Sequence, residues 1–492
     1  MKKIINLNKH NLIIFFLGLL SFIGSIYQGS YIYDGFHWGL VGSNAQDFLN
    51  GKKPYGDFFV HYGFLTVLLQ SLALKIYNSI FSILVLSSLV YSISLILLAK
   101  LTEKFFSNNY VYLLIFIIFF MQPFIVFPWH TYFIFLISLI SIFLFIQKKN
   151  YSLFLFGSCL QIGFLFSESY KIFSILIIIF SILIIFFEKK NFKTQYKKMI
   201  FIIFGYLSPL AIFYIYLKFN NLIPLWKMHS KIPDIFINQM NTNLIDLVIN
   251  FFTTYLYGSL NIFSSSFFSL GLLINLACIL FVILFLLNRH KNLDLLFISI
   301  FSLLLNFMLV FRHESFRFFC GPIIGIIILF FFIKNLKNDF FKYCAVILII
   351  FIATISNPFE KSSANKNFTN KSVKINSYKS NDIDKFRYMR FKKDTWNHYD
   401  KLNKLLIEIA KSCNDIEYFY NATSDHYYYF LTSDYLDSIQ KVPGYSESIL
   451  KNYYDSINNI FDASLENKIN QNIEKEKIIL IRENLNTNYI KI

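Results

Sequence analysis

Long apolar runs fill the chain up to about residue 356 and follow one another with short polar breaks. A helix needs about 20 apolar residues to cross a bilayer, with about 17 as the lower limit. The runs that meet or approach this length are 11–27, 79–99, 110–127, 131–147, 151–167, 172–187, 199–217, 266–287, 293–311, 317–333 and 341–356. The pattern predicts an α-helical polytopic membrane protein with about eleven spans.

Two further apolar runs are shorter or interrupted, and the positive charge of the loops decides their placement. Residues 63–77 contain Gln70 and Lys75, and residues 247–263 are broken by polar residues. If both runs lie at the interface, the short loops on one side carry most of the lysines, as the positive-inside rule requires. Full crossing of 63–77 would put the lysine-rich stretch 188–198 outside. The charge therefore predicts a cytoplasmic N-terminus and an outer C-terminus.

Composition agrees with this class and excludes others. The 492 residues are 55% hydrophobic and only 15% charged, against about 25% charged in a typical soluble domain. The net charge of +17 gathers in the predicted inner loops, so it indicates orientation and not a nucleic-acid partner. Five scattered cysteines show no disulfide framework or metal-ligand spacing.

The cellular location follows from the N-terminal run and from residue usage. Residues 11–27 follow three lysines and lack a small-residue cleavage site, which predicts an uncleaved first span. The excess of Ile, Phe, Asn and Lys is typical of an AT-rich bacterium. We therefore expect a multi-pass protein of the bacterial cytoplasmic (inner) membrane.

The chain divides into a membrane domain, 1–356, and a soluble extracytoplasmic domain, 357–492. The second part has balanced charge and no spanning run. A helical period over 396–412 and strand-like runs at 416–420 and 477–482 predict a small α/β domain on the outer face.

Two outer loops are long for a membrane bundle, the first at 28–78 and the second at 218–265. The second contains two prolines, Trp226 and His229, and no continuous apolar run within 218–246. It is either a lid or substrate clamp or a mobile solvated connection, and the sequence leaves both open.

Three carboxylates and two histidines gather in the first outer loop. They are Asp34, Asp47, Asp57, His37 and His61. Ionisable groups at a membrane boundary are costly, and function is the usual reason for them. The alternative is that they are solvated loop residues.

The middle of the first outer loop has the period of an amphipathic helix. Apolar residues recur at helical spacing from Trp38 to Leu49, which predicts a helix lying on the bilayer. Gly51 is placed to end it in the left-handed conformation. Such a helix would hold Asp34 and Asp57 on either side of it, near the headgroup plane.

A short outer turn carries the cations Arg312, His313 and Arg317. Guanidinium groups bind phosphate oxygens in a bidentate manner, so this turn is a candidate site for a lipid phosphate. The alternative is that the arginines snorkel toward headgroups.

Three short motifs combine with this topology. They are Tyr33-Asp34-Gly35, the run Gly51-Lys52-Lys53-Pro54-Tyr55-Gly56-Asp57-Phe58, and Tyr62-Gly63-Phe64-Leu65. Together they resemble the GT-C glycosyltransferases, specifically the bacterial relatives of protein mannosyltransferases and of the lipid A aminoarabinose transferase. The resemblance implies transfer of a sugar from a polyprenyl-phosphate-linked donor to a lipid, glycan or protein acceptor at the outer face of the membrane.

The resemblance also implies roles for particular residues. Asp34 would be the general base or acceptor-orienting carboxylate, Asp57 the second acid of the loop, and the 312–317 turn the site of the lipid phosphate. Further candidate substrate-binding residues are His37, Tyr55, His61, Glu168 and Lys171.

The chain departs from the family at two positions of these motifs. Gly35 stands where many members have a second acid, and Phe64 where proline is usual. The sequence therefore leaves open whether a divalent cation such as Mg²⁺ or Mn²⁺ binds at Asp34 and Asp57 or whether no metal is needed.

Two other functions compete with this one. A transporter or flippase of lipid-linked sugars would need ionisable or broken spans near the midplane. The predicted spans are nearly free of charge, and Pro123 and Pro209 are isolated, so transport ranks second. A non-catalytic scaffold ranks third, because polar groups gather on one face.

Overall fold

The computed structural model describes most of the apolar part of the chain and parts of the C-terminal region. The residues described are 9–31, 35, 37–55, 58, 60, 62–122, 124–125, 128–168, 170–188, 191–229, 249, 253, 266–309, 319–355, 377–379, 383–412, 418–421, 427–432, 440–442 and 478–481.

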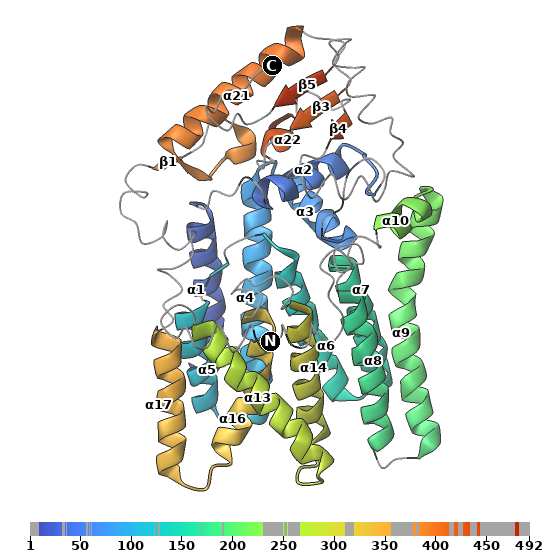
Figure 1. The fold of residues 1–492 in the computed structure, drawn as a ribbon, viewed down its shortest axis with the longest axis vertical. Coiled ribbons are helices and arrows are strands. Elements are labelled where there is room, and N and C mark those ends of the chain that lie inside the picture. Colours follow the sequence, from blue (N-terminus) through green and yellow to red (C-terminus); the bar gives the residue numbers. More distant parts are fainter. Residues whose placement is uncertain are drawn as a thin grey trace, which may run out of the picture.

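Within the described residues, eleven helices pack together in a bundle (Figure 1). They are α1 (Lys9–Gly29), α4 (Ile80–Phe105), α5 (Asn108–Met121), α6 (His130–Gln147), α7 (Asn150–Phe166), α8 (Tyr170–Phe187), α9 (Phe192–Phe219), α13 (Ser266–Leu286), α14 (Leu293–Leu309), α16 (Pro322–Lys334) and α17 (Asp339–Ile355). Each overlaps one of the eleven apolar runs of the sequence.

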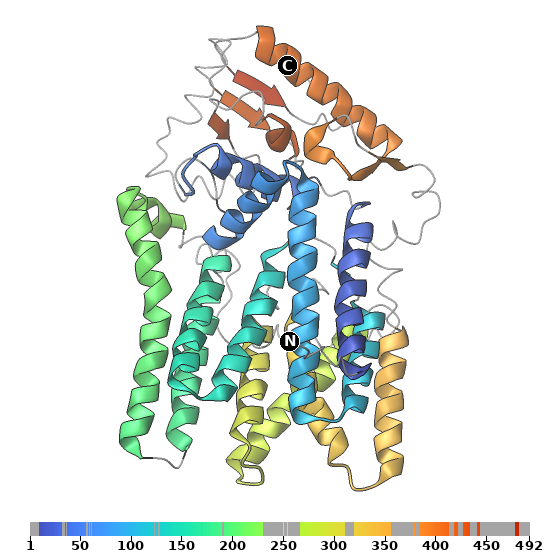
Figure 2. The same cartoon turned by 180° about the vertical axis from the view of Figure 1, so that it is seen from behind.

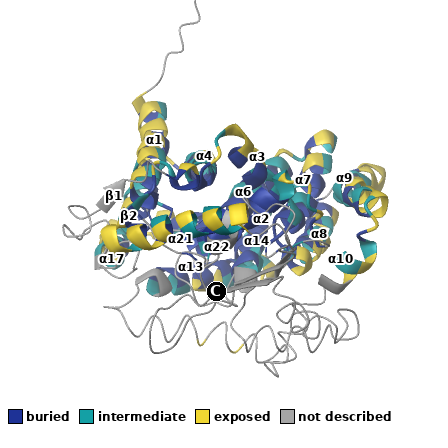
Figure 3. Cartoon of the chain, turned by 90° about the horizontal axis from the view of Figure 1, so that it is seen from above, coloured by how far each residue is buried: buried dark blue, intermediate teal, exposed yellow. Residues whose placement is uncertain are grey.

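Length and composition make six of these helices candidates for crossing a membrane. These six are α1, α4, α6, α8, α9 and residues 269–286 of α13. Figure 3 shows exposed positions on α1 and α9 at the rim of the bundle, and α17 also has exposed side chains. Large apolar side chains are among them, and Phe15, Phe204 and Phe351 are 55%, 64% and 56% exposed. Such a rim suits contact with lipid tails, and the fold is that of a helical membrane protein.

Helix α5 is shorter than the apolar run that predicts it. The run extends to residue 127, but the helix ends at Met121. Two prolines, Pro123 and Pro128, follow. Proline lacks the N–H that a helix needs and disfavours helical conformation in the residue before it. The predicted boundary at residue 127 was therefore wrong by six residues, since the prolines interrupt the helix while the hydropathy stays high.

Small residues let α7 and α9 approach each other closely. A Cβ on Gly205 would lie 1.9 Å from the carbonyl oxygen of Phe154, and one on Gly157 would lie 2.2 Å from that of Ile202. The Ser158 hydroxyl donates to the Gly205 carbonyl oxygen at 3.0 Å. Close backbone contact of this kind replaces the hydrophobic driving force that helices lack inside a membrane.

Two shorter helices, α2 (His37–Leu49) and α3 (Phe64–Ile76), lie across one end of the bundle. The views from the two sides show them between the bundle and the C-terminal elements (Figures 1 and 2). Helix α3 covers the run 63–77 that the loop charges predict to lie at the interface.

The C-terminal region contains both helices and strands. Its helical elements are η2 (Asp384–Phe386), α21 (Lys393–Ser412) and α22 (Tyr427–Thr432). Strand β1 (Ser377–Lys379) pairs antiparallel with β2 (Arg390–Lys392). Strand β3 (Tyr418–Asn421) lies between β4 (Gln440–Val442) and β5 (Ile478–Ile481) and pairs with both in parallel. The predicted helix at 396–412 and the strands at 416–420 and 477–482 are present as α21, β3 and β5.

The surroundings of helix α2 differ from those predicted for it. Its polar face was expected to meet water, but Asn44 and Asp47 are only 8% and 2% exposed. Helices α3 and α22 both pack against α2, so protein surrounds much of the helix. The buried Asp47 carboxylate pairs with Lys52 at 3.2 Å. Gly51 does end the helix with φ of +81°, as predicted.

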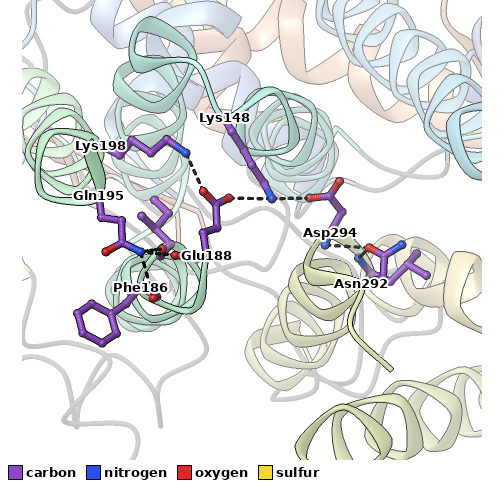
Figure 4. A network of polar contacts seen from close by, with 9 residues as sticks. Lys148, Phe186, Glu188, Gln195, Lys198, Asn292 and Asp294 are labelled. Carbon is purple, nitrogen blue, oxygen red and sulfur yellow. Dashed lines mark hydrogen bonds and ion pairs between the residues drawn. The ribbon is translucent and has the colours of Figure 1, made fainter. Parts of the chain in front are cut away.

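At the opposite end of the bundle, four charged residues form one network (Figure 4). Lys148 Nζ lies 2.9 Å from Glu188 and 3.2 Å from Asp294, and Lys198 Nζ lies 2.8 Å from the other oxygen of Glu188. In the predicted topology residues 148, 188, 198 and 294 lie in or beside the inner loops, so all four are expected on the same side of the membrane, and the structure brings them together. The network joins the ends of α6, α8, α9 and α14.

Candidate functional site

The structure describes only part of the predicted site. Asp34, Asp57, His61, Arg312, His313 and Arg317 lie outside the described residues. Those it describes are His37, Tyr55, Glu168 and Lys171. The roles predicted for the acids and the arginines therefore stay predictions.

Two histidines and two aromatic residues meet where α2 and α3 approach the start of α6. The His37 ring packs on Trp129 with centroids 4.8 Å apart, and the His130 ring packs on Tyr62 at 4.4 Å. We call His37, Tyr62, Trp129 and His130 the histidine–aromatic cluster. Trp129, His130 and Tyr62 are 1%, 7% and 7% exposed, whereas His37 is partly exposed.

Hydrogen bonds and a close backbone approach hold the cluster in place. Gln70 of α3 donates to the Pro128 carbonyl oxygen at 3.2 Å, and Thr66 donates to that of Phe166 at 2.9 Å. A Cβ on Gly63 would lie 2.6 Å from the carbonyl oxygens of Leu165 and Phe166. Only glycine allows α3 to begin this close to the end of α7, which accounts for the glycine beside Tyr62.

A second pair, Tyr55 and Glu168, links the first outer loop to the turn between α7 and α8. Tyr55 has φ of 67°, in the left-handed region that non-glycine residues rarely adopt. Its N–H donates to the Phe58 carbonyl oxygen at 3.1 Å, which closes the turn. Its side chain is buried, and its hydroxyl bonds to the Glu168 carboxylate. Burial and the nearby Glu168 charge both raise the pKa of Tyr55 well above its ordinary value, so the phenol stays protonated and donates.

Lys171 does not join either group of side chains. It lies in the first turn of α8, and its side chain is exposed. Its backbone N–H bonds to the Glu168 carbonyl oxygen at 3.1 Å, which forms the turn before the helix. The proposal that Lys171 binds substrate therefore has no support from its described neighbours.

Trp129 and His130 are absent from the residues that the sequence analysis proposes. A signal for them exists in the sequence, because Pro128, Trp129 and His130 directly precede the apolar run at 131–147. An ionisable residue beside an aromatic one at the start of a span is a reason to suspect a site. Only the fold reveals that they meet Tyr62 and His37.

The cluster offers groups that suit recognition of a polar, ring-shaped ligand. Imidazole nitrogens can donate or accept hydrogen bonds at neutral pH, and aromatic faces provide flat apolar surface. Among the described residues, no three His, Cys, Asp or Glu side chains lie close enough to hold a metal ion. Whether a cation binds at Asp34 and Asp57 stays a prediction, because both lie outside this part of the chain.

We expect replacement of Tyr55 by phenylalanine to lower the free energy of unfolding by about 1.5–3 kcal/mol, since it removes a hydrogen bond to a charged group. Thermal unfolding in detergent measures the change. Tyr216→Phe is the matched control, because Tyr216 packs against the same apolar cluster and its hydroxyl has no hydrogen bond to another described residue. Equal effects of the two variants would contradict a stabilising Tyr55–Glu168 bond.

Comparison with known proteins assigns no family to the chain. No family model matches it, and no curated protein matches its sequence. Its own residues and their placement therefore have to support any function.

Proposed function

We propose that this protein is a membrane glycosyltransferase of the GT-C type. It would move a sugar from a polyprenyl-phosphate-linked donor to a lipid, glycan or protein acceptor at the outer face of a bacterial cytoplasmic membrane. In this proposal all eleven bundle helices cross the membrane, the N-terminus is cytoplasmic and residues 357–492 form an extracytoplasmic α/β domain.

The histidine–aromatic cluster is the observation that carries the proposal. It lies at one end of the apolar bundle, beneath the C-terminal elements, where a lipid carrier could remain among the helices while its headgroup meets polar side chains. In sequence, Asp34 precedes His37 by three residues and His61 directly precedes Tyr62. The motif Tyr33-Asp34-Gly35 therefore lies close in sequence to His37, and the motif Tyr62-Gly63-Phe64-Leu65 contains Tyr62 of the cluster.

The proposed reaction is a single displacement at the anomeric carbon. Asp34 accepts the proton of the acceptor hydroxyl, whose oxygen forms the new glycosidic bond. The bond between the anomeric carbon and the phosphate oxygen breaks, and the lipid phosphate leaves with its electron pair. Arg312 and Arg317 would stabilise the charge that develops on this phosphate. One carboxylate beside the attacked carbon favours inversion.

The transporter alternative receives less support from the helices. Coupled transport needs ionisable groups or broken helices near the midplane. The apolar run 110–127 is interrupted after Met121, so only the distribution of charge counts against transport. In the described parts of the bundle helices, Lys, Arg, Asp and Glu lie toward the helix ends, as Lys100 and Glu103 do in α4. The buried pair Asn275 and Asn306 between α13 and α14 is neutral.

Proteoliposomes containing the purified protein and a labelled polyprenyl-phosphate sugar test the proposal. We expect label to move to an extracted envelope acceptor fraction only when the protein is present. Counterflow of the labelled lipid without covalent transfer would support the transporter and contradict the enzyme. Mass spectrometry of envelope glycans from a deletion strain would then identify the acceptor.

A further inference from the structure

Both ends of the first outer loop bond to the same short segment of the C-terminal region. At the start of the loop, the Ser30 carbonyl oxygen accepts a hydrogen bond from the Arg390 N–H at 2.7 Å. At its end, the Ser79 hydroxyl lies 3.1 Å from the carbonyl oxygen of Lys385 and 2.9 Å from that of Arg387. Residues 385–390 therefore bridge the end of α1 and the start of α4.

The side chain of Arg390 reinforces the first of these contacts. Its guanidinium lies 4.8 Å from the centre of the Tyr31 ring, within the range of a cation–π interaction. Tyr31 is 6% exposed and packs edge-on against Tyr27 of α1, with ring centroids 5.2 Å apart. Arg390 thus contacts the residues that directly follow α1 through its backbone N–H and through its guanidinium.

The segment 385–390 is itself fixed to the rest of the C-terminal region. Lys385 is 1% exposed, donates to the Phe430 carbonyl oxygen at 2.6 Å and lies 4.6 Å from the Phe430 ring. Phe386 packs against Tyr399 of α21 and Tyr427 of α22 at 5.3 and 4.9 Å. The bridge is therefore anchored in a packed aromatic core.

A third contact reaches the middle of the loop. A Cβ on Gly42 of α2 would lie 2.9 Å from Ile80 and 3.0 Å from Phe430. The C-terminal region therefore touches the loop at its start, at α2 and at its end.

From the contacts at Ser30 and Ser79 we propose that residues 385–390 clamp the first outer loop, and that Ser79 and Arg390 are positioning residues that hold His37 and Tyr62 in the positions needed for sugar transfer. The catalytic part of this inference rests on the proposed function, whereas the clamp itself does not. Holding both ends of a loop in place reduces the number of conformations that it can adopt before binding. A displacement of about 1 Å can reduce a rate by about 100-fold.

Ser79 allows a sharp test, because its hydroxyl also caps α4 by accepting from the Phe81 N–H at 3.3 Å. Ser79→Asp keeps an acceptor for the cap, but its carboxylate cannot donate and repels the two carbonyl oxygens of the bridge. Ser79→Thr keeps both functions. We expect Ser79→Asp to lower kcat about 10- to 100-fold with KM within about threefold, and Ser79→Thr to retain the wild-type rate.

Hydrogen–deuterium exchange supplies a readout that does not depend on activity. We expect faster exchange in peptides covering 27–40 and 383–391 in Ser79→Asp, and wild-type exchange in Ser79→Thr. If Ser79→Asp does not fold, Arg390→Gln with Arg390→Lys as its conservative control replaces it.

The outcomes separate the clamp from the reaction. Unchanged exchange in Ser79→Asp and Arg390→Gln would overturn the clamp. Faster exchange with an unchanged kcat would overturn the positioning role while leaving the proposed function intact. If wild type transfers no sugar, the proposed function and the positioning role fail together, and exchange still decides whether the clamp exists.

Discussion

Replacement of Asp34 by asparagine is expected to lower sugar transfer at least about 100-fold, because an amide cannot accept the proton of the acceptor hydroxyl and a general base contributes about 10²–10⁴-fold. The loss should appear mainly in kcat, since asparagine keeps the size and most of the hydrogen-bonding capacity of aspartate. Initial rates of label transfer from a polyprenyl-phosphate sugar in proteoliposomes measure it.

A carboxylate elsewhere in the chain provides the control for Asp34→Asn. Asp394 lies in the first turn of α21 and is exposed, so Asp394→Asn makes the same chemical change at an exposed carboxylate outside the motifs of the first outer loop. We expect it to keep the wild-type rate. Full activity of Asp34→Asn at equal protein levels would remove Asp34 from the mechanism.

The mechanism also requires Asp34 and Arg312 to face the same side of the membrane. Cysteines introduced at these positions should react with the same impermeant reagent added from outside. Reaction from opposite sides would separate the base from the cations that stabilise the leaving phosphate, and the proposed displacement would then have no site.

The sequence predicts those parts of the fold that depend on local pattern. Apolar length predicts the bundle helices, and the 3.6-residue period predicts α2 and α21. Gly51 predicts the end of α2, because its positive φ is a local requirement of the backbone. Lys148, Glu188 and Asp294 lie close together in the structure. The charge pattern predicts that their loops lie on one side of the membrane, and only residues on the same side can meet.

Contacts between distant segments are the part that the sequence does not predict. The pattern of α2 is amphipathic, yet its polar residues Asn44 and Asp47 are buried, and α22, which comes much later in the chain, packs against the helix. The pairing of Tyr62 with His130 likewise depends on how α3 docks against α6 and α7. The helical period shows that one face of α2 is polar. It does not show whether water or another part of the protein contacts that face.

At the other end of the bundle, Glu188→Gln is expected to lower the free energy of unfolding by about 3–5 kcal/mol, the usual effect of removing one partner of a buried ion pair. Glu188 and Lys198 are 7% and 5% exposed, and the variant leaves the ammonium groups of Lys148 and Lys198 facing a neutral amide. Thermal and denaturant unfolding in detergent measure the change.

An exposed ion pair gives the matched control for Glu188→Gln. Asp339 lies 2.9 Å from Lys342, and its side chain is 78% exposed, so Asp339→Asn should change stability by no more than about 1 kcal/mol. Adding Lys198→Met to Glu188→Gln should recover part of the loss, since it removes a charge left without its partner. A loss below about 1 kcal/mol in Glu188→Gln would show that the network does not stabilise the bundle.

The same network predicts how the difference in unfolding midpoint between wild type and Glu188→Gln depends on pH. Burial raises the pKa of Glu188, but the ammonium groups of Lys198 and Lys148 outweigh it and hold the pKa below the ordinary value of 4.5. A depressed carboxyl pKa stabilises the folded state above that ordinary value, and the contribution is lost as the pH falls through the folded-state pKa. The unfolding midpoints should therefore differ most near neutral pH and converge in acid. A gap that stays constant as the pH falls below 4.5 would mean that the Glu188 charge is not its source.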